Sequence, residues 1–222
     1  MAYGSRPAKV RHGHRVGGAA VLGAVLALAG LSMAAAEEGF TSLFDGRSLS
    51  GWRANESPGS WRVADGELIC HGPRSHLFYV GSDPDRPEEF GNFHLRMEVL
   101  TRPGANSGVF FHTAFQPDGW PAHGYEIQVN NSQGDPVRTG SLYHVVRNFN
   151  PPAPDDRWFL LELMVRGKAI GVAVDGKVLY EFVEPDGVTG TRRLSRGLFA
   201  LQAHDPASEV HYRDIRVKRL PD

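Results

Sequence analysis

One short stretch of the sequence, GYEIQVNNS at residues 124–132, carries polar side chains at alternate positions. Successive side chains of a β-strand point to opposite faces, so Glu126, Gln128 and Asn130 would share one face. They would supply one carboxylate, which can move a proton, and two carboxamides, which can hold a polar ligand. Enzymes that cleave sugars ordinarily use two carboxyl groups, so this strand by itself disfavours ordinary glycoside hydrolysis. The alternative is a solvated outer face.

Further polar residues lie where predicted strands meet loops, which is where functional sites gather. Asn106 stands at the mouth of the stretch NSGVFFHT, in which alternation puts His112 on the face of Phe110. Gln202 and His204 share a face at the end of another apolar run. These four polar residues are candidates for ligand binding or catalysis.

Trp120 and Tyr143 lie close to these motifs in the sequence, and their flat rings can stack on sugars. Core packing is the alternative for both. The residues of types that bind divalent metal ions are Glu126, His112, His144 and His204. Their separations match no local motif such as H-E-x-x-H, so a divalent metal ion is a candidate cofactor that the sequence does not establish.

The elements that must position these residues are short alternating runs separated by turn residues, which predict about ten strands and almost no helix. An all-β fold of two antiparallel sheets, a jelly-roll sandwich, follows from this pattern. Hairpin turns are predicted at Asp65-Gly66, Arg166-Gly167 and Asp175-Gly176, and a bulge near Arg213 or Asp214. The expected strands lie within residues 61–71, 93–100, 108–115, 125–130, 141–146, 158–184, 197–204 and 209–220.

Residues 1–36 have the order of a secretory signal peptide: four basic residues, an uncharged apolar run over residues 16–33, and three alanines that end at Ala36. We therefore expect residues 37–222 to form a single domain that is secreted or periplasmic, with no stable membrane insertion after cleavage. A retained membrane anchor is the alternative, because the run approaches the length of a spanning helix.

The charge of the expected mature chain disfavours nucleic acid as a partner. The leader holds four of the 24 Lys and Arg residues and none of the 25 Asp and Glu residues, which leaves 20 basic against 25 acidic residues and a formal net charge of −5. Cys70 is the only cysteine, so no internal disulfide can form. We expect Cys70 to be a small packed residue.

Seven segments of the mature chain form one ordered set: GFTSLFDGRSLSGWR, WRVADGELIC, NSGVFFH, HGYEIQVNNSQGDPVRTGSLY, DGKVLYEF, LQAH and HYRDIRVKRL. Together these segments resemble the 3-keto-disaccharide hydrolase domain family, formerly a domain of unknown function in the concanavalin A-like lectin and glucanase superfamily. The resemblance extends from Gly39 to Leu220. It departs from the family pattern at His112, where Arg is common, at Asp205 and Pro206, where Gly is common, and at residues 129–131, where an Asp is common.

The resemblance implies a concanavalin A-like sandwich and an exported enzyme that acts on 3-keto glycosides or 3-keto disaccharides. A carbonyl at C3 acidifies the hydrogen on C2, so one base can form an enolate that expels the C1 substituent, and water can then add. The catalytic candidates are Glu126, His204 and Gln128, with Glu126 or a neighbouring histidine as the base. The candidates for substrate binding are Asn106, His112, Trp120, Asn130, Tyr143 and Gln202.

Two other classes of function stay open on the sequence alone. A non-catalytic carbohydrate-binding module would use the same polar face to hold an unmodified glycan. A structural domain of the cell envelope would leave that face solvated. The fold cannot choose among these classes, because function depends on the site.

Overall fold

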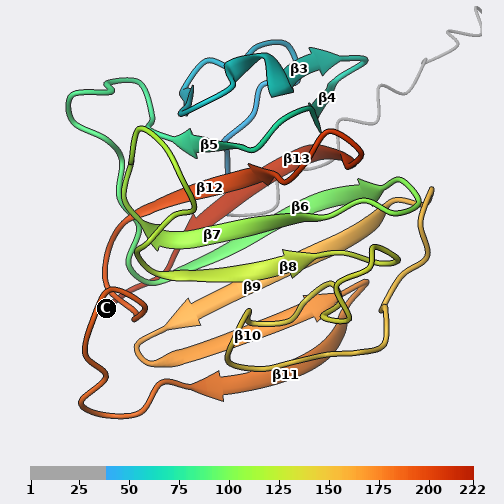
Figure 1. Cartoon of the computed structure of the whole chain (residues 1–222). Coiled ribbons are helices and arrows are strands. Elements are labelled where there is room, and N and C mark those ends of the chain that lie inside the picture. The colour runs from blue at the N-terminus through green and yellow to red at the C-terminus, as the bar shows by residue number, and fades with distance from the viewer. Residues whose placement is uncertain (1–38) are drawn as a thin grey trace, which may run out of the picture. The chain divides into compact units, whose positions relative to one another are not determined.

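The computed structural model describes residues 39–222, which form two antiparallel β-sheets packed face to face (Figure 1). The described part of the chain contains one 3-10 turn, η1 (Pro58–Ser60), and no α-helix. The predicted two-sheet sandwich is therefore confirmed. The predicted signal peptide lies outside the described residues, so it and the export that it implies stay predictions.

The larger sheet has eight strands in the order β11-β10-β9-β6-β13-β4-β3, with β1 paired to β13. Its strands are β1 (Thr41–Ser42), β3 (Trp61–Ala64), β4 (Glu67–His71), β6 (Phe93–Thr101), β9 (Phe159–Arg166), β10 (Ala169–Val174), β11 (Lys177–Val183) and β13 (Glu209–Arg219).

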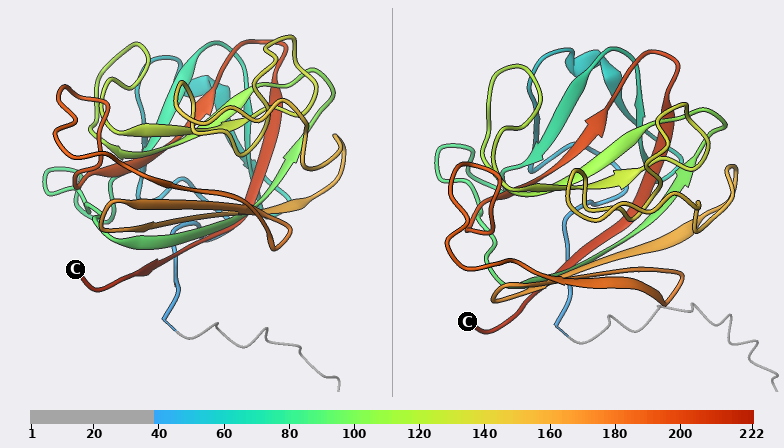
Figure 2. Two further views of the ribbon diagram at one scale, coloured as in Figure 1. Left: turned by 90° about the horizontal axis from the view of Figure 1, so that it is seen from below. Right: turned by 60° about the horizontal axis from the view of Figure 1, so that its bottom comes forward.

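The smaller sheet has five strands in the order β2-β5-β12-β7-β8. Its strands are β2 (Trp52–Ala54), β5 (Ser75–Tyr79), β7 (Ser107–Thr113), β8 (Tyr125–Val129) and β12 (Leu198–Ala203). Figure 2 shows the two sheets as two layers, with several loops gathered over the five-stranded sheet.

The core lies between the sheets and follows from strand alternation. In β6, Phe93, Leu95, Met97 and Val99 point inward and are buried, whereas the residues between them are partly exposed. The strands β7, β8 and β12 differ, because every residue in them is buried. One face of these three strands packs on the core, and the loops cover the other face.

Two of the three predicted hairpin turns are confirmed, because β3 and β4 join at Asp65-Gly66, and β10 and β11 join at Asp175-Gly176. All four residues have positive φ angles between 48° and 81°, as a two-residue hairpin turn of this kind requires. The third turn lies at Gly167-Lys168, one residue after the predicted Arg166-Gly167, because Arg166 still pairs with Ala169 as the last residue of β9.

The predicted bulge in the last strand is also confirmed. The pairing of β13 with β6 shifts register between Arg213 and Arg216, and Asp214 there has a φ of 51°.

The predicted strand over residues 141–146 is wrong. Leu142 accepts hydrogen bonds from the amides of Val145 and Val146, which closes a turn in place of a strand, and His144 within it has a φ of 66°. Just before this turn, residues 139–143 run along the free edge of β8 and exchange backbone hydrogen bonds with it. The segment therefore lies beside the polar face of β8.

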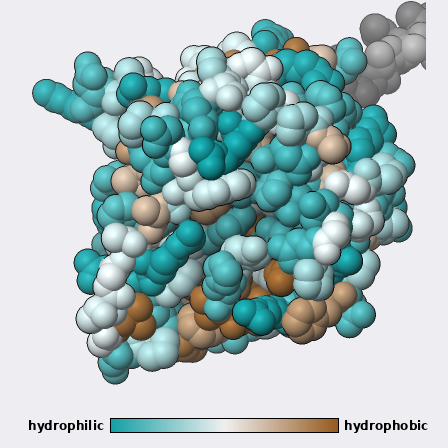
Figure 3. Space-filling model, in the orientation of Figure 1, coloured by the Kyte–Doolittle hydropathy of each residue, from teal (hydrophilic) through white to brown (hydrophobic). Residues whose placement is uncertain are grey.

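The face of the molecule in Figure 3 is mainly hydrophilic, and its hydrophobic side chains form only small groups. Single exposed apolar residues of this kind are normal on a protein surface. Within residues 39–222, no helix has the length and apolar character needed to cross a membrane.

Candidate active site

A pocket of about 290 Å³ lies on the outer face of the five-stranded sheet. Alternation in β8 explains its floor, because Tyr125, Ile127 and Val129 point into the core and leave Glu126 and Gln128 on the opposite face. The other residues that line it come from β7, β12 and five loops: Asn106, Phe110, Trp120, Asp135, Tyr143, His144, Arg192, Gln202 and His204.

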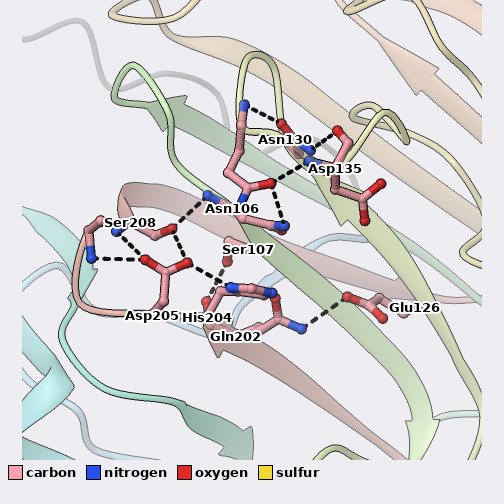
Figure 4. A network of polar contacts seen from close by, with 11 residues as sticks. Asn106, Ser107, Glu126, Asn130, Asp135, Gln202, His204, Asp205 and Ser208 are labelled. Carbon is pink, nitrogen blue, oxygen red and sulfur yellow. Dashed lines mark hydrogen bonds and ion pairs between the residues drawn. The ribbon is translucent and has the colours of Figure 1, made fainter.

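Glu126 is the most deeply buried acid of the pocket, with only 6% of its surface exposed. Its Oε1 atom accepts a hydrogen bond of 3.0 Å from Nε2 of Gln202 (Figure 4). Burial raises the pKa of the Glu126 carboxyl to about 7, although the Gln202 bond and the positive charge of Arg192 both lower it. A carboxyl that titrates near neutrality can take up and return a proton at ordinary pH.

Gly108 on β7 makes room for this carboxylate. A Cβ atom at Gly108 would lie 2.3 Å from Oε1 of Glu126, which is far inside van der Waals contact. Because Gly108 has no side chain, the Glu126 side chain can lean across β7 towards Gln202 on β12.

Two other polar atoms at the pocket are buried without a hydrogen-bond partner among the described residues. They are Oδ1 of Asn106 and Oε1 of Gln202. An unpaired buried acceptor carries a cost of about 1–3 kcal/mol, which a ligand hydroxyl donating to it would remove. The pocket therefore has acceptors ready for a polyhydroxylated ligand.

His204 is oriented by the residue that follows it. Its Nδ1 atom lies 2.7 Å from Oδ2 of Asp205, and Asp205 is held by the amides of Ala207 and Ser208 and by the Ser208 hydroxyl. These contacts keep the pKa of Asp205 below its usual range in spite of partial burial. The arrangement fixes one ring nitrogen of His204, and the other, Nε2, has no hydrogen-bond partner within residues 39–222.

Trp120 forms one wall of the pocket, and the contacts of its ring explain its position. The ring lies 5.3 Å from the ring of His204, and the Arg74 guanidinium lies over it at 5.3 Å. Glu56 holds this arrangement because it accepts two hydrogen bonds from Arg74 and one from the backbone amide of Gly119.

His76 lies beneath Trp120 with the two ring centroids 5.4 Å apart, and neither of its ring nitrogens has a partner among the described residues. Burial lowers the pKa of His76 to about 3, so the ring is neutral at ordinary pH.

Asp135 brings a second carboxylate to the pocket. Its Oδ1 atom accepts a hydrogen bond from the amide of Val137, and its Oδ2 atom accepts one of 3.2 Å from the hydroxyl of Tyr143. The sequence argument counted one carboxylate because it considered only the strand, and the structure corrects that count. The number of carboxylates in the pocket therefore does not disfavour ordinary glycoside hydrolysis, which uses two carboxyl groups.

A family model described as the 3-keto-alpha-glucoside-1,2-lyase-like domain matches residues 39–218, which is most of the chain. The chain belongs to this family. The resemblance predicted from the sequence is thereby confirmed, and the family match includes every pocket residue.

A curated protein to which the chain is similar is the 3-keto-disaccharide hydrolase of Bacteroides thetaiotaomicron. It is 32% identical over 79 residues, which cover 33% of this chain and 27% of the relative. The match therefore spans less than a third of the relative's own length.

Solved structures share the fold at lower identity. A protein provisionally described as a glycosyl hydrolase, from Parabacteroides distasonis, has a TM-score of 0.70 and 20% identity, with 83% of this chain and 95% of that one covered. The carbohydrate-binding module CBM66 of Bacillus subtilis has a TM-score of 0.55 and 11% identity, with 76% and 96% covered. Because these folds carry both catalytic and binding functions, the likeness does not distinguish between them.

Seven of the nine site residues predicted from the sequence line the pocket. They are Asn106, Trp120, Glu126, Gln128, Tyr143, Gln202 and His204. His144, one of the metal candidates, lines it as well. Their presence in one pocket does not by itself assign a role to any of them.

His112 is not at the pocket, because the strand alternation that should place it there is broken. Its φ angle is 55°, and the pairing of β7 with β12 shifts register beside it, so the side chain turns away from the face of Phe110. Nε2 of His112 lies 2.9 Å from the carbonyl oxygen of Gly91, and Nδ1 accepts a hydrogen bond of 3.1 Å from the amide of Ser195. Burial lowers the pKa of this histidine. His112 therefore connects two loops as a neutral ring.

Asn130 is also absent from the pocket, because β8 ends at Val129 and the chain turns away. Nδ2 of Asn130 donates to the carbonyl oxygens of Asp135 and Val137, and Oδ1 accepts from the amide of Gln133 and from Arg138. All of its hydrogen-bonding capacity goes to the loop. Asn130 therefore holds the loop that carries Asp135.

The described residues do not form a metal centre of the usual kind. Within residues 39–222, no three side chains of His, Cys, Asp or Glu converge closely enough to hold a metal ion. The side chains present therefore do not fit a protein-bound metal with three such ligands, and the chemistry below uses none.

Asp135 and Arg192 are the pocket residues that sequence reasoning missed. Both lie in loops, where no strand period indicates the direction of a side chain. The only signal for Asp135 was its place inside a segment that carries the family resemblance.

Proposed function

We propose that this protein is a carbohydrate-active enzyme that cleaves 3-keto glycosides or 3-keto disaccharides by removing the proton on C2 and eliminating the C1 substituent. The observation that carries the proposal is Glu126, a buried carboxyl with a pKa of about 7 on the floor of a pocket. Membership of the lyase-like family supports the substrate class, as does the name of the Bacteroides relative.

The pocket volume supports a small ligand. About 290 Å³ is at the low end for ligand pockets, which suits a sugar unit or a short saccharide better than a polymer. Trp120 would stack on a sugar ring, and the unpaired oxygens of Asn106 and Gln202 would accept hydrogen bonds from its hydroxyl groups.

In the elimination step, the ionised Glu126 takes the proton from C2, and the electron pair forms an enolate with the C3 oxygen. The amide group of Gln128 is placed on the same strand face to donate to that oxygen, and the charge of Arg192 favours the anion. The enolate then re-forms the C3 carbonyl, a C1–C2 double bond forms, and the C1–O bond breaks. His204, held at Nδ1 by Asp205, gives a proton to the departing oxygen from Nε2.

A second candidate function is ordinary hydrolysis of unoxidised glycosides by a pair of carboxyl groups. The observation that favours it is Asp135, which lines the same pocket as Glu126. In this reaction Glu126 would act as the acid and Asp135 as the base or nucleophile. A binding module without turnover is the remaining alternative.

The test measures nitrophenol release from nitrophenyl 3-keto-glucoside and from its unoxidised parent glucoside. The reactions are run in D2O, each with and without a chelator. We expect nitrophenol release from the keto sugar only, and deuterium at C2 of any hydrated sugar product. Free 3-keto-glucose incubated with the enzyme in D2O serves as the control, because it measures how much deuterium enters C2 after cleavage is complete. Release from the unoxidised glycoside without deuterium at C2 would favour the carboxylate pair, and saccharide binding without release would favour the binding module.

The chelator arm tests the metal candidate separately. Loss of release with a chelator, and its return on adding a divalent ion, would support a metal. Unchanged release would support a reaction that uses only the side chains named above.

A further inference from the structure

Asp135 is a charged side chain of the pocket to which the elimination step gives no role. It follows β8, the edge strand of the five-stranded sheet that carries Glu126. The strand order β12-β7-β8 places His204, which follows β12, on one side, and the segment that carries Asp135 follows β8 at the other edge of the sheet. The pocket therefore contains two groups besides Glu126, namely His204 and Asp135, that can each handle a proton.

Contacts with the edge of β8 hold Asp135 in register with Glu126. The Tyr143 hydroxyl donates to Oδ2 of Asp135, and the Tyr143 amide donates to the carbonyl oxygen of Glu126 at 2.9 Å. Asn130 holds the backbone oxygen of Asp135 at 3.0 Å, and the Val137 amide holds Oδ1 at 2.8 Å. The loop is thus built to present this carboxylate at the pocket wall.

The chemistry of the proposed function leaves a task for such a group. After elimination, Glu126 holds the proton from C2 and cannot act as a base, while the pocket contains a ketone conjugated to the C1–C2 double bond. Addition of water to C1 requires a second base to take a proton from the water. The electrons of the double bond then form an enolate with the C3 oxygen. C2 recovers a proton from Glu126, whose carboxyl proton exchanges with solvent between the two steps, so the product formed in D2O carries deuterium at C2.

We infer that Asp135 is this second base, so that the pocket catalyses hydration of the unsaturated ketone as well as its formation. The inference rests on the proposed function. The new bonds are C1–O from water and C2–H from Glu126, and the proton that Asp135 receives passes to solvent. One water is consumed, nothing is oxidised or reduced, and the sum of the two steps is net hydrolysis.

The test measures the two steps separately with the purified protein. Elimination is followed by nitrophenol release from nitrophenyl 3-keto-glucoside, and hydration by the loss of ultraviolet absorbance of the isolated unsaturated ketone. The variants are Asp135→Asn, Tyr143→Phe, which removes the hydrogen bond to Oδ2, and His144→Gln, which tests the other candidate base on this side of the pocket. Asp186→Asn is the matched control, because the Asp186 side chain is 92% exposed and pairs with Lys168 on the surface.

In Asp135→Asn we expect hydration to fall by roughly 10²- to 10⁴-fold, the usual contribution of a positioned general base. The rate of elimination should stay within about threefold of wild type, so the unsaturated ketone accumulates. In Tyr143→Phe we expect a smaller fall in the rate of hydration, again with little change in the rate of elimination.

The inference is overturned if Asp135→Asn hydrates the ketone at the wild-type rate, if both steps fall together, or if His144→Gln alone causes accumulation. Those results would leave the proposed function standing. If the wild-type protein releases no nitrophenol from the keto sugar, the proposed function itself fails.

Discussion

Gln202 on β12 donates a hydrogen bond to Glu126 on β8, although β7 lies between these two strands in the sheet. The contact crosses β7 at Gly108, where a side chain would occupy the position of the Glu126 carboxylate. The orientation of the central acid of the pocket therefore depends on the absence of a side chain on the intervening strand.

Gly108→Ala is expected to lower kcat by at least about tenfold, because the added methyl displaces the carboxylate and small displacements of a reacting group have large effects on rate. The melting temperature should change little, since the nearest atoms belong to the Glu126 side chain and not to backbone. Kinetics and thermal unfolding measure the two effects. Gly171→Ala in β10 is the control, because its added Cβ meets no atom within 4 Å. An unchanged kcat in Gly108→Ala would contradict the prediction.

Glu126→Gln is expected to reduce turnover by roughly 10²- to 10⁴-fold and to change the pH dependence of stability. The folded protein keeps the Glu126 proton up to about pH 7, whereas the unfolded chain releases it near pH 4.5. Wild type therefore loses stability relative to Glu126→Gln as the pH rises through this window, by about 3 kcal/mol in all.

Denaturant unfolding of both proteins at pH 4.5 and at pH 7.5 measures this effect, because contributions from other groups cancel in the difference. An identical pH dependence in the two proteins would show that the Glu126 carboxyl is not perturbed in the folded state.

Trp120→Ala is expected to raise the pKa of His76 from about 3 towards its ordinary value. Burial is the main cause of the low value, and the Trp120 ring covers His76 on the pocket side. Titration of the histidine ring signals by NMR measures the change. Phe149→Ala removes an exposed aromatic ring outside the pocket and should leave the titration unchanged. If His76 titrates alike in all three proteins, Trp120 is not what excludes water from it.

His112→Ala is expected to destabilise the protein by about 2 kcal/mol or more, because it removes two hydrogen bonds and the packing of a buried ring. The kcat of the folded protein should stay within about twofold, since His112 lies outside the pocket. His144→Ala should change the stability by less than about 0.5 kcal/mol, because His144 is exposed. A large loss of kcat in folded His112→Ala would contradict this prediction and show that His112 contributes to the active site.

The sequence by itself determined the all-β fold, the hairpin turns and the polar face of β8. These features repeat at the period of a strand or depend on turn residues such as Asp65 and Gly66, so they can be predicted from neighbours in the chain. The same period explains why Glu126 and Gln128 lie on the face away from the core.

Only the tertiary structure decided which residues meet at the pocket. A positive φ angle at His112 reverses the direction of its side chain, and the end of β8 at Val129 removes Asn130 from the face. Asp135 reaches the pocket because its loop folds back along the edge of β8. Backbone hydrogen bonds between residues 139–143 and the edge of β8 hold the loop there, and no periodic pattern in the sequence indicates them. Alternation predicts directions within a strand, but a bulge or a loop changes them through contacts that form only when the sheets pack.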